Sequence, residues 1–325
     1  MENTLIRLDP VEEILTEQPN SAFITANSLS CSLEEIRRLH HIPVFVKDNE
    51  AAISQVDFID TTVDLISDLF RNERILAPQI RLSHPIKGRI PEAKNKSASE
   101  LEEYEKTIYY ERMAFTIEIP SIQEDINGNR LSLTVGGVKA YNLENLNSTS
   151  GSDQHFKVFI GFQNKVCTNM CISTDGYIGD LKIKNLNQLR ASMDYLFQSY
   201  AAAEHLSQLK RFTNYSLTEQ QFALLIGRCR MYQHIPRALK DQIFPESLSL
   251  TDTQIGSVVK DYYWDQNFGS DSYGTLSLWQ LYNLFTGANK SSYIDSFLDR
   301  SVNAHEFIKQ LQYGLENKQT NWFLN

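Results

Sequence analysis

Four segments between Arg112 and Ser173 alternate apolar and polar residues with a period of two. They read RMAFTIEI (112–119), RLSLTV (130–135), HFKVFIGF (155–162) and KVCTNMCI (165–172). Because successive side chains of a strand point to opposite faces, each segment is predicted to be a strand with one apolar and one polar face. Asn127-Gly128, between the first two segments, is typical of a hairpin turn. These patterns indicate an antiparallel sheet with one face buried and the other in water.

Two glycines, Gly136 and Gly137, interrupt the second segment where it continues toward residue 141. Glycines inside a strand often mark a bulge, and a bulge shifts the alternation by one residue. The sequence therefore predicts that Lys139 and Tyr141 turn to the polar face, while Val138 and Ala140 stay on the buried face.

The segments around the sheet have helical periodicity. One stripe of apolar residues runs from Leu186 to about Arg211 and predicts a single long helix that crosses the buried face of the sheet. Shorter helices follow, the last at about 302–317. The predicted fold is α+β, with a central antiparallel sheet of about four to five strands covered by a long helix and with a helical C-terminal half. Three regions are expected: an acidic, mostly helical N-terminal region (1–74), the sheet with its long helix (75–211), and the helical C-terminal region (212–325).

Composition limits the classes of protein to which the chain can belong. Hydrophobic residues make up 42% of the 325 residues, enough for a substantial core. No segment approaches the roughly 20 apolar residues of a membrane helix, and the chain opens with acidic residues, which predicts a cytoplasmic protein without a membrane partner. Four cysteines do not form a disulfide scaffold, and cysteines and histidines lack the spacing of a metal site. We therefore expect no metal and no cofactor.

Catalytic motifs are absent from the sequence. It contains no G-x-S-x-G elbow, Walker loop, dinucleotide-binding glycine motif or H-E-x-x-H helix. An unrecognised enzyme stays an alternative if folding gathers distant ionisable residues, for example His155 with Asp153 and Glu118. No catalytic residue is assigned.

Charge is distributed unevenly along the chain, whose net charge is −9. Residues 1–70 hold 13 acidic and 4 basic residues, whereas residues 71–96 hold 7 basic and 2 acidic residues. An acidic segment is thus followed directly by a basic one. Both are either solvated surface or contact surfaces for charged partners.

The polar face of the predicted sheet is basic, with Glu118 as its one acid. Its five cations are Arg112, Arg130, Lys139, Lys157 and Lys165. An open basic sheet binds the phosphate backbone of single strands, and an outward Tyr141 would offer a stacking surface for a base. The basic segment adds Arg81, Lys87 and Arg89 to this predicted nucleic-acid site. The alternative is that these cations keep an exposed sheet soluble.

Aromatic residues gather in two C-terminal groups. Tyr262-Tyr263-Trp264 precede Phe268, and Trp279, Tyr282 and Phe285 follow at near-helical spacing. The spacing favours helix packing in a core over a ligand cage.

Several stretches resemble an uncharacterised domain-of-unknown-function family of Bacteroidetes related to phage-like and plasmid-like proteins. They are LTVGGVKAYN (133–142), VCTN (166–169), WQLYNL (279–284) and TGAN (286–289). The resemblance implies a bacterial mobile genetic element as the setting and transfers no catalytic residue. The order of strands followed by a long helix is also similar in topology to single-strand annealing proteins of the Rad52 and RecT kind, which use a strongly basic groove, whereas this chain is acidic overall.

Three functional hypotheses follow. The leading one is a non-enzymatic, cytoplasmic mobile-element protein that binds single-stranded nucleic acid through the basic sheet face. The second is a protein–protein interaction factor, anti-defence or regulatory, whose acidic N-terminal region meets a host protein. The third is an unrecognised enzyme. The sequence leaves the oligomeric state open, self-association included.

Overall fold

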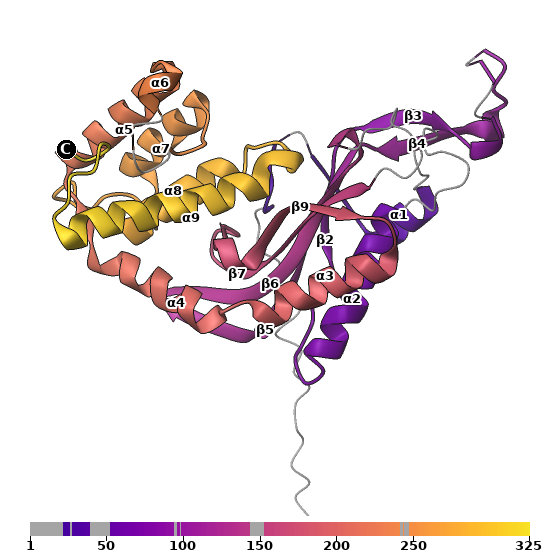
Figure 1. Ribbon diagram of the computed structural model, residues 1–325, viewed down its shortest axis with the longest axis horizontal. Helices are drawn as coiled ribbons and strands as arrows, with labels where there is room; N and C mark the ends of the chain where they lie inside the picture. The colour runs from indigo at the N-terminus through magenta and orange to yellow at the C-terminus, as the bar shows by residue number, and fades with distance from the viewer. Residues whose placement is uncertain are drawn as a thin grey trace, which may run out of the picture.

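The computed structural model describes residues 22–26, 28–39, 53–93, 96–97, 99–143, 153–240, 243 and 247–325. For residues 39, 86–89, 91, 107–109 and 143 it describes the backbone alone. The fold is α+β, as predicted: a curled antiparallel sheet lies at the centre and helices make up the C-terminal half (Figure 1).

The central sheet has seven strands, more than the four to five predicted. They pair in the order β1-β2-β5-β6-β7-β8, and β9 also pairs with β7. Their bounds are β1 Leu29–Cys31, β2 Gln79–Leu82, β5 Arg112–Ile126, β6 Asn129–Ala140, β7 Gln154–Asn164, β8 Met170–Cys171 and β9 Tyr177–Ile183. The first three predicted strands are confirmed. The fourth predicted strand, at residues 165–172, is mostly wrong. Residues 165–167 form a turn, only Met170 and Cys171 pair with β7, and β9 pairs with the rest of that edge of β7.

The turn between β5 and β6 is the predicted hairpin. Asn127 and Gly128 both have positive φ, at 53° and 78°, as a tight two-residue hairpin turn requires. The side chain of Asp125 accepts a hydrogen bond from the Gly128 N–H at 2.9 Å.

The predicted bulge at Gly136 and Gly137 is wrong. The register of β5 with β6 runs without a shift from Arg112 opposite Ala140 to Ile119 opposite Leu133. Lys139 therefore lies on the buried face, opposite Met113. The glycines serve packing instead: a Cβ on Gly137 would lie 2.5 Å from the Phe58 ring, and one on Gly136 would lie 2.9 Å from the Phe159 ring.

Helices that precede and follow the sheet strands in the sequence cover the apolar face of the sheet. They are α2 (Gln55–Leu69), α3 (Leu186–Ser199) and α4 (Ala202–Arg211) (Figure 1). The predicted single long helix breaks after α3, where Tyr200 has an extended backbone with ψ of 124°. The Asp175 side chain accepts a hydrogen bond from the Ala201 N–H at 3.1 Å, which stabilises the break.

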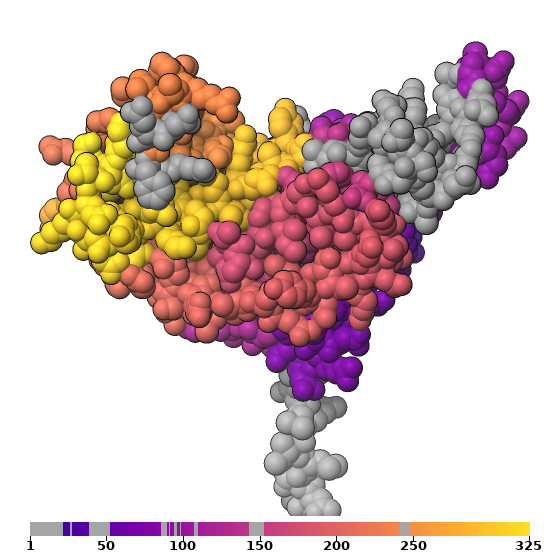
Figure 2. All heavy atoms as spheres, viewed as in Figure 1, coloured from indigo at the N-terminus to yellow at the C-terminus, as the bar shows by residue number. Residues whose placement is uncertain are grey.

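The remaining elements form a short N-terminal unit, a ribbon and a helical lobe. α1 (Leu33–Leu39) begins at a capping box formed by Ser32 and Glu35. β3 (Pro85–Arg89) and β4 (Lys106–Tyr110) pair in a two-stranded ribbon that projects at the end of the molecule away from the lobe (Figure 1). Figure 2 shows the lobe, in orange and yellow, at the opposite end. The lobe contains α5 (Glu219–His234), α6 (Arg237–Lys240), α7 (Asp252–Trp264), α8 (Leu278–Asn289) and α9 (Ile294–Asn317), with the short strands β10 (Ser216–Leu217) and β11 (Leu276–Ser277).

The second face of the sheet is covered, which corrects the prediction of an open polar face. α9 begins at Ile294, where the sequence predicted a start at about residue 302, and its first turns pack on this face. Phe297 and Leu298 of α9 contact a patch of small and apolar strand residues, with Phe23 from the N-terminal segment beside them. The strand residues of this patch are Ala114, Val138, Ala140, Phe159 and Met170. Because these residues offer an apolar surface, burying them under a helix is favourable.

Among the described residues, no helix is long and apolar enough to cross a membrane.

Candidate functional site

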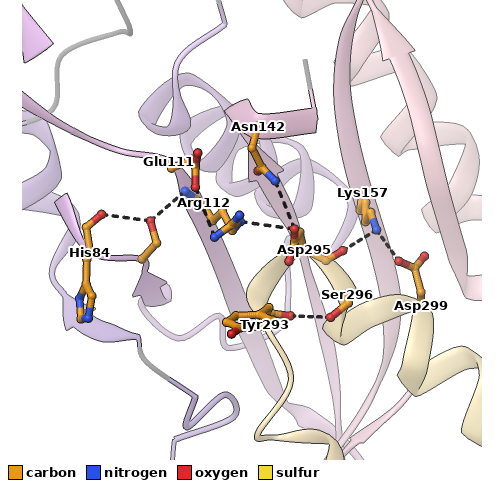
Figure 3. A network of polar contacts seen from close by, with 10 residues as sticks. His84, Glu111, Arg112, Asn142, Lys157, Tyr293, Asp295, Ser296 and Asp299 are labelled. Atoms are coloured by element: carbon orange, nitrogen blue, oxygen red, sulfur yellow. Dashed lines mark hydrogen bonds and ion pairs between the residues drawn. The ribbon is translucent and has the colours of Figure 1, made fainter. Parts of the chain in front are cut away.

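Two of the predicted nucleic-acid-binding cations hold α9 against the sheet (Figure 3). Arg112 lies 3.3 Å from the Asp295 carboxylate and 3.3 Å from that of Glu111. Lys157 donates to the Asp295 carbonyl oxygen at 2.6 Å and pairs with the Asp299 carboxylate. We call these contacts the α9 seam. In the seam, the charges expected to meet phosphate are neutralised by carboxylates of the same chain.

Three further predicted residues do not form an open binding face. Lys139 is fully buried, with its ammonium group 4.1 Å from the centre of the Phe156 ring. Tyr141, predicted as an outward stacking surface, is also buried. Lys165 pairs with the Glu118 carboxylate at 2.8 Å. The prediction that Lys139 and Tyr141 face outward is wrong because no bulge shifts the alternation.

The other predicted cations lie apart from one another. Arg130 is exposed at the start of β6. Arg81 on β2 donates to the Ser28 carbonyl oxygen at 2.6 Å, and burial lowers its pKa. Lys87 and Arg89 lie on β3 in the projecting ribbon, and their side chains are outside the described residues. The seven predicted residues whose side chains the structure describes are therefore not gathered on one accessible surface.

The acidic N-terminal region is partly built into the fold. Asp60 of α2 pairs with Arg37 of α1 at 2.6 Å, and Asp68 of α2 pairs with Arg190 of α3 at 2.6 Å. These carboxylates hold helices together. Residues 9–18, whose apolar spacing predicts a short helix, lie outside the described residues.

The ionisable residues considered for catalysis stay apart. His155 contacts Asp180, with 2.6 Å between the ring nitrogen and the carboxylate. Asp153 is 3.9 Å from Lys184, and Glu118 accepts from the Ser132 hydroxyl. Among the residues described, no group of three or more His, Cys, Asp and Glu side chains is arranged to hold a metal ion.

The stretches that carry the resemblance join the sheet to α8. Asn169 donates to the Asn283 carbonyl oxygen at 2.9 Å, and the Trp279 indole N–H donates to the Asn129 side chain at 3.1 Å. All of these residues except Asn129 are buried. Their polar groups therefore satisfy buried hydrogen bonds rather than facing a ligand.

Exposed aromatic residues lie at one end of the helical lobe. The exposed fractions are 61% for Tyr263, 77% for Trp264 and 90% for Tyr273. Four carboxylates belong to the same region: Glu219 contacts Tyr263, Asp271 contacts the backbone of Tyr273, and Asp261 and Asp265 flank the α7 aromatic residues in the sequence. We call these seven residues the aromatic–acidic patch. Large exposed aromatic side chains on a folded surface are typical of interaction sites.

Hydrogen bonds fix the backbone of this patch. The Asp265 side chain accepts from two backbone N–H groups of the following loop, each at 2.8 Å. Asp271 accepts in the same way from the N–H groups of Tyr273 and Thr275, at 2.9 and 2.8 Å. The Tyr262 hydroxyl donates to the Gly274 carbonyl oxygen at 2.7 Å. The loop is thus held in place before any partner binds, which lowers the entropic cost of binding.

The electrostatics of the patch favour a cationic partner. Tyr263 donates its hydroxyl hydrogen to Glu219 at 2.8 Å, and this hydrogen bond raises the pKa of Tyr263. Burial, and then the charge of Asp265, raise the pKa of Asp261. Between residues 261 and 289 the sequence contains no lysine or arginine. Lys260 lies directly before this segment and lowers the pKa of Asp261, so one neighbouring cation partly compensates the four carboxylates.

Sequence reasoning assigned this aromatic group to the core, and the structure divides it. Tyr262, Phe268, Trp279, Tyr282 and Phe285 are buried, as predicted. Tyr263 and Trp264 are exposed, because successive residues of a helix point about 100° apart and only one of the three at the end of α7 faces inward. Three adjacent aromatic residues on one helix were the signal that could have revealed the patch.

Comparison with known proteins places the chain in a family. Residues 6–324 match the family described as "Domain of unknown function, B. Theta Gene description (DUF3871)". The chain belongs to this family. The searches of curated proteins and of solved structures gave no significant match. The family is one of unknown function, so membership in DUF3871 adds no chemistry to the site.

Proposed function

We propose that this DUF3871 protein is a non-enzymatic protein-interaction factor that binds a lysine- and arginine-rich segment of a partner protein at its aromatic–acidic patch. The observation that carries the proposal is the exposure of Trp264 at the end of α7 and of Tyr273 on the hydrogen-bonded loop that follows it, together with four carboxylates of the patch. The contact surface differs from the one expected from the sequence, which was the acidic N-terminal region.

The chemistry of the patch suits guanidinium and ammonium groups. A cation over an exposed aromatic ring gains roughly 0.5–1 kcal/mol, most with tryptophan. Exposed ion pairs with the surrounding carboxylates add up to about 1 kcal/mol each and are screened by salt. A segment with several cations would therefore bind through many small contributions, and its affinity would fall as salt is added.

The test is a fluorescence titration of the full chain with a peptide of alternating arginine and glycine. Trp264 is the most exposed of the three tryptophans, so its emission should report binding. Trp264→Ala removes this reporter, so its affinity is measured by calorimetry, where loss of one cation–π contact predicts about two- to fivefold weaker binding. Asp271→Asn should also weaken binding.

Matched controls separate the patch from general charge. Tyr195→Ala removes another exposed aromatic side chain, 76% exposed on α3, and should leave the affinity unchanged. A peptide of alternating glutamate and glycine should not bind. If the arginine peptide does not bind at low salt, or binds Trp264→Ala and wild type equally, the proposal is wrong.

Nucleic-acid binding is the second candidate, now at the β3–β4 ribbon. The register of the ribbon sets Arg89 opposite Lys106 and Lys87 opposite Ile108, so three basic residues occupy alternate, paired positions of its backbone. This candidate ranks second because Glu103 pairs with Lys106 at 2.5 Å. Double replacement Lys87→Glu and Arg89→Glu should abolish binding to labelled oligothymidylate if the ribbon binds it. The mobile-element setting and the cytoplasmic location stay predictions.

A further inference from the structure

α4 is a short helix that depends on its neighbours for stability (Figure 1). Its 10 residues are too few for a stable isolated helix in water. The residue at its N-cap, Ala201, provides no side-chain hydrogen bond to the first turn. Only His205 and Leu209 of this helix are buried. The docking of α4 therefore depends largely on one histidine and one leucine.

His205 faces His305 of α9 inside the core. The two imidazole rings are nearly perpendicular, with their centres 4.9 Å apart, and the residues are 3% and 2% exposed. The Phe162 ring lies 5.9 Å from the ring of His205, and the Phe212 ring lies 5.7 Å from that of His305. In the described part of the chain, the Nε2 atom of each imidazole has no hydrogen-bond partner. A proton added to Nε2 of His205 would find no acceptor there.

Three neutral groups complete this cluster. The Tyr200 hydroxyl lies 2.6 Å from the Nδ1 atom of His205. The Tyr282 ring of α8 lies 6.0 Å from the His305 ring, and the Cys171 thiol of β8 is beside Tyr282. Burial raises the pKa of all three groups, so none of them carries a charge near neutral pH.

The charged groups around the pair have partners of their own. Glu306 of α9 contacts Nδ1 of His305 at 3.4 Å, a hydrogen bond that lowers the pKa of Glu306 to about 2. Asp175 accepts from the Ala201 N–H at 3.1 Å. No carboxylate of the described residues pairs with His205, whose pKa is kept low by burial and then by His305. The ion pairs of α4 lie at its exposed C-terminal end, where Lys210 meets Glu124 at 3.2 Å and Arg211 meets Glu316 at 2.8 Å.

We propose that the His205–His305 pair is an acid-sensitive switch, in which protonation of His205 releases α4 from α9 and uncovers the apolar residues beneath it. While α4 is docked, His205 is neutral. In the released helix it binds a proton with the ordinary pKa of about 6.5. Acid therefore favours release, and the ratio of released to docked α4 should rise about 30-fold between pH 7.5 and pH 5.0. This inference goes beyond the proposed function, because the aromatic–acidic patch contains neither histidine.

Hydrogen–deuterium exchange of the full chain at pH 7.5 and pH 5.0 tests the switch. Each exchange rate is divided into that of an unstructured peptide at the same pH, which gives a protection factor. Amides of α4 should be less protected than those of β6 at both pH values, because α4 opens without the rest of the chain. The protection of α4 should fall about 30-fold at the lower pH.

Variants assign this fall to His205. His205→Gln removes the titrating ring and should abolish most of the fall. His234→Gln is the matched control, because His234 is exposed at the end of α5, and it should fall as wild type does. Circular dichroism checks that each variant is folded. In wild type, α4 amides as well protected as those of β6, or unchanged by pH, would overturn the proposal, as would an equal fall in His205→Gln.

Discussion

Replacing Lys157 with methionine tests whether the α9 seam fastens α9 to the sheet. The side chain is 12% exposed, and its ammonium group donates to the Asp295 carbonyl oxygen at 2.6 Å. A hydrogen bond from a charged group contributes roughly 1.5–3 kcal/mol. The ion pair with Asp299, which is 51% exposed, adds at most about 1 kcal/mol because water screens it. Methionine retains the buried stem, so we expect the free energy of unfolding to fall by about 2–3 kcal/mol.

Urea unfolding followed by circular dichroism measures this change. Lys309→Met on the same helix is the matched control, because Lys309 is 47% exposed and only 3.4 Å from Glu306. It should lower the free energy of unfolding by less than about 0.5 kcal/mol. Equal stability of Lys157→Met and Lys309→Met would refute the conclusion that the seam fastens the helix.

Three further predictions concern stability. Gly137→Ala should lower the free energy of unfolding by at least about 2 kcal/mol, since its Cβ would meet the Phe58 ring at 2.5 Å, and an unchanged urea midpoint would contradict this packing. Asn169→Ala removes one donor from the buried Asn283 carbonyl oxygen, which still accepts from the Thr286 hydroxyl at 3.3 Å. The free energy of unfolding should fall by about 0.5–1.5 kcal/mol, and an unchanged thermal unfolding curve would contradict a structural role for this hydrogen bond. Burial lowers the pKa of His205 well below its ordinary value, so below about pH 6.5 the unfolded chain binds a proton that the folded chain does not. Stability should therefore fall as the pH decreases through this range, and His205→Gln should flatten the fall in urea curves recorded at several pH values.

The strands could be predicted because alternation is a local property. β5, β6 and β7 occur where the period of two occurs, and the Asn127-Gly128 turn joins the first two. The errors came from long-range packing. A glycine inside a strand can mark a bulge or can make room for a close aromatic contact. At Gly137 the sequence does not distinguish the two, and only the position of the Phe58 ring on α2 shows that the contact is the reason.

The prediction that the polar face of the sheet is open was wrong because of long-range packing as well. Its charged residues dominate the pattern, but Ala114 and Ala140 lie among them and provide the surface on which α9 packs. Nothing near these residues in the sequence indicates a helix that begins at Ile294. Charge alternation alone therefore predicted which residues share a face and could not predict what covers it.

The central claim is that binding takes place at the aromatic–acidic patch and not on the sheet. The most direct measurement is a pair of titrations of the wild-type chain at low salt, one with the arginine–glycine peptide and one with oligothymidylate of about 30 nucleotides, longer than the usual site size. We predict that the peptide changes the emission of Trp264 with an affinity that weakens as salt is added, and that the oligonucleotide does not bind through the sheet. Tight oligonucleotide binding that is lost in Arg112→Ala, together with no response to the peptide, would contradict the claim.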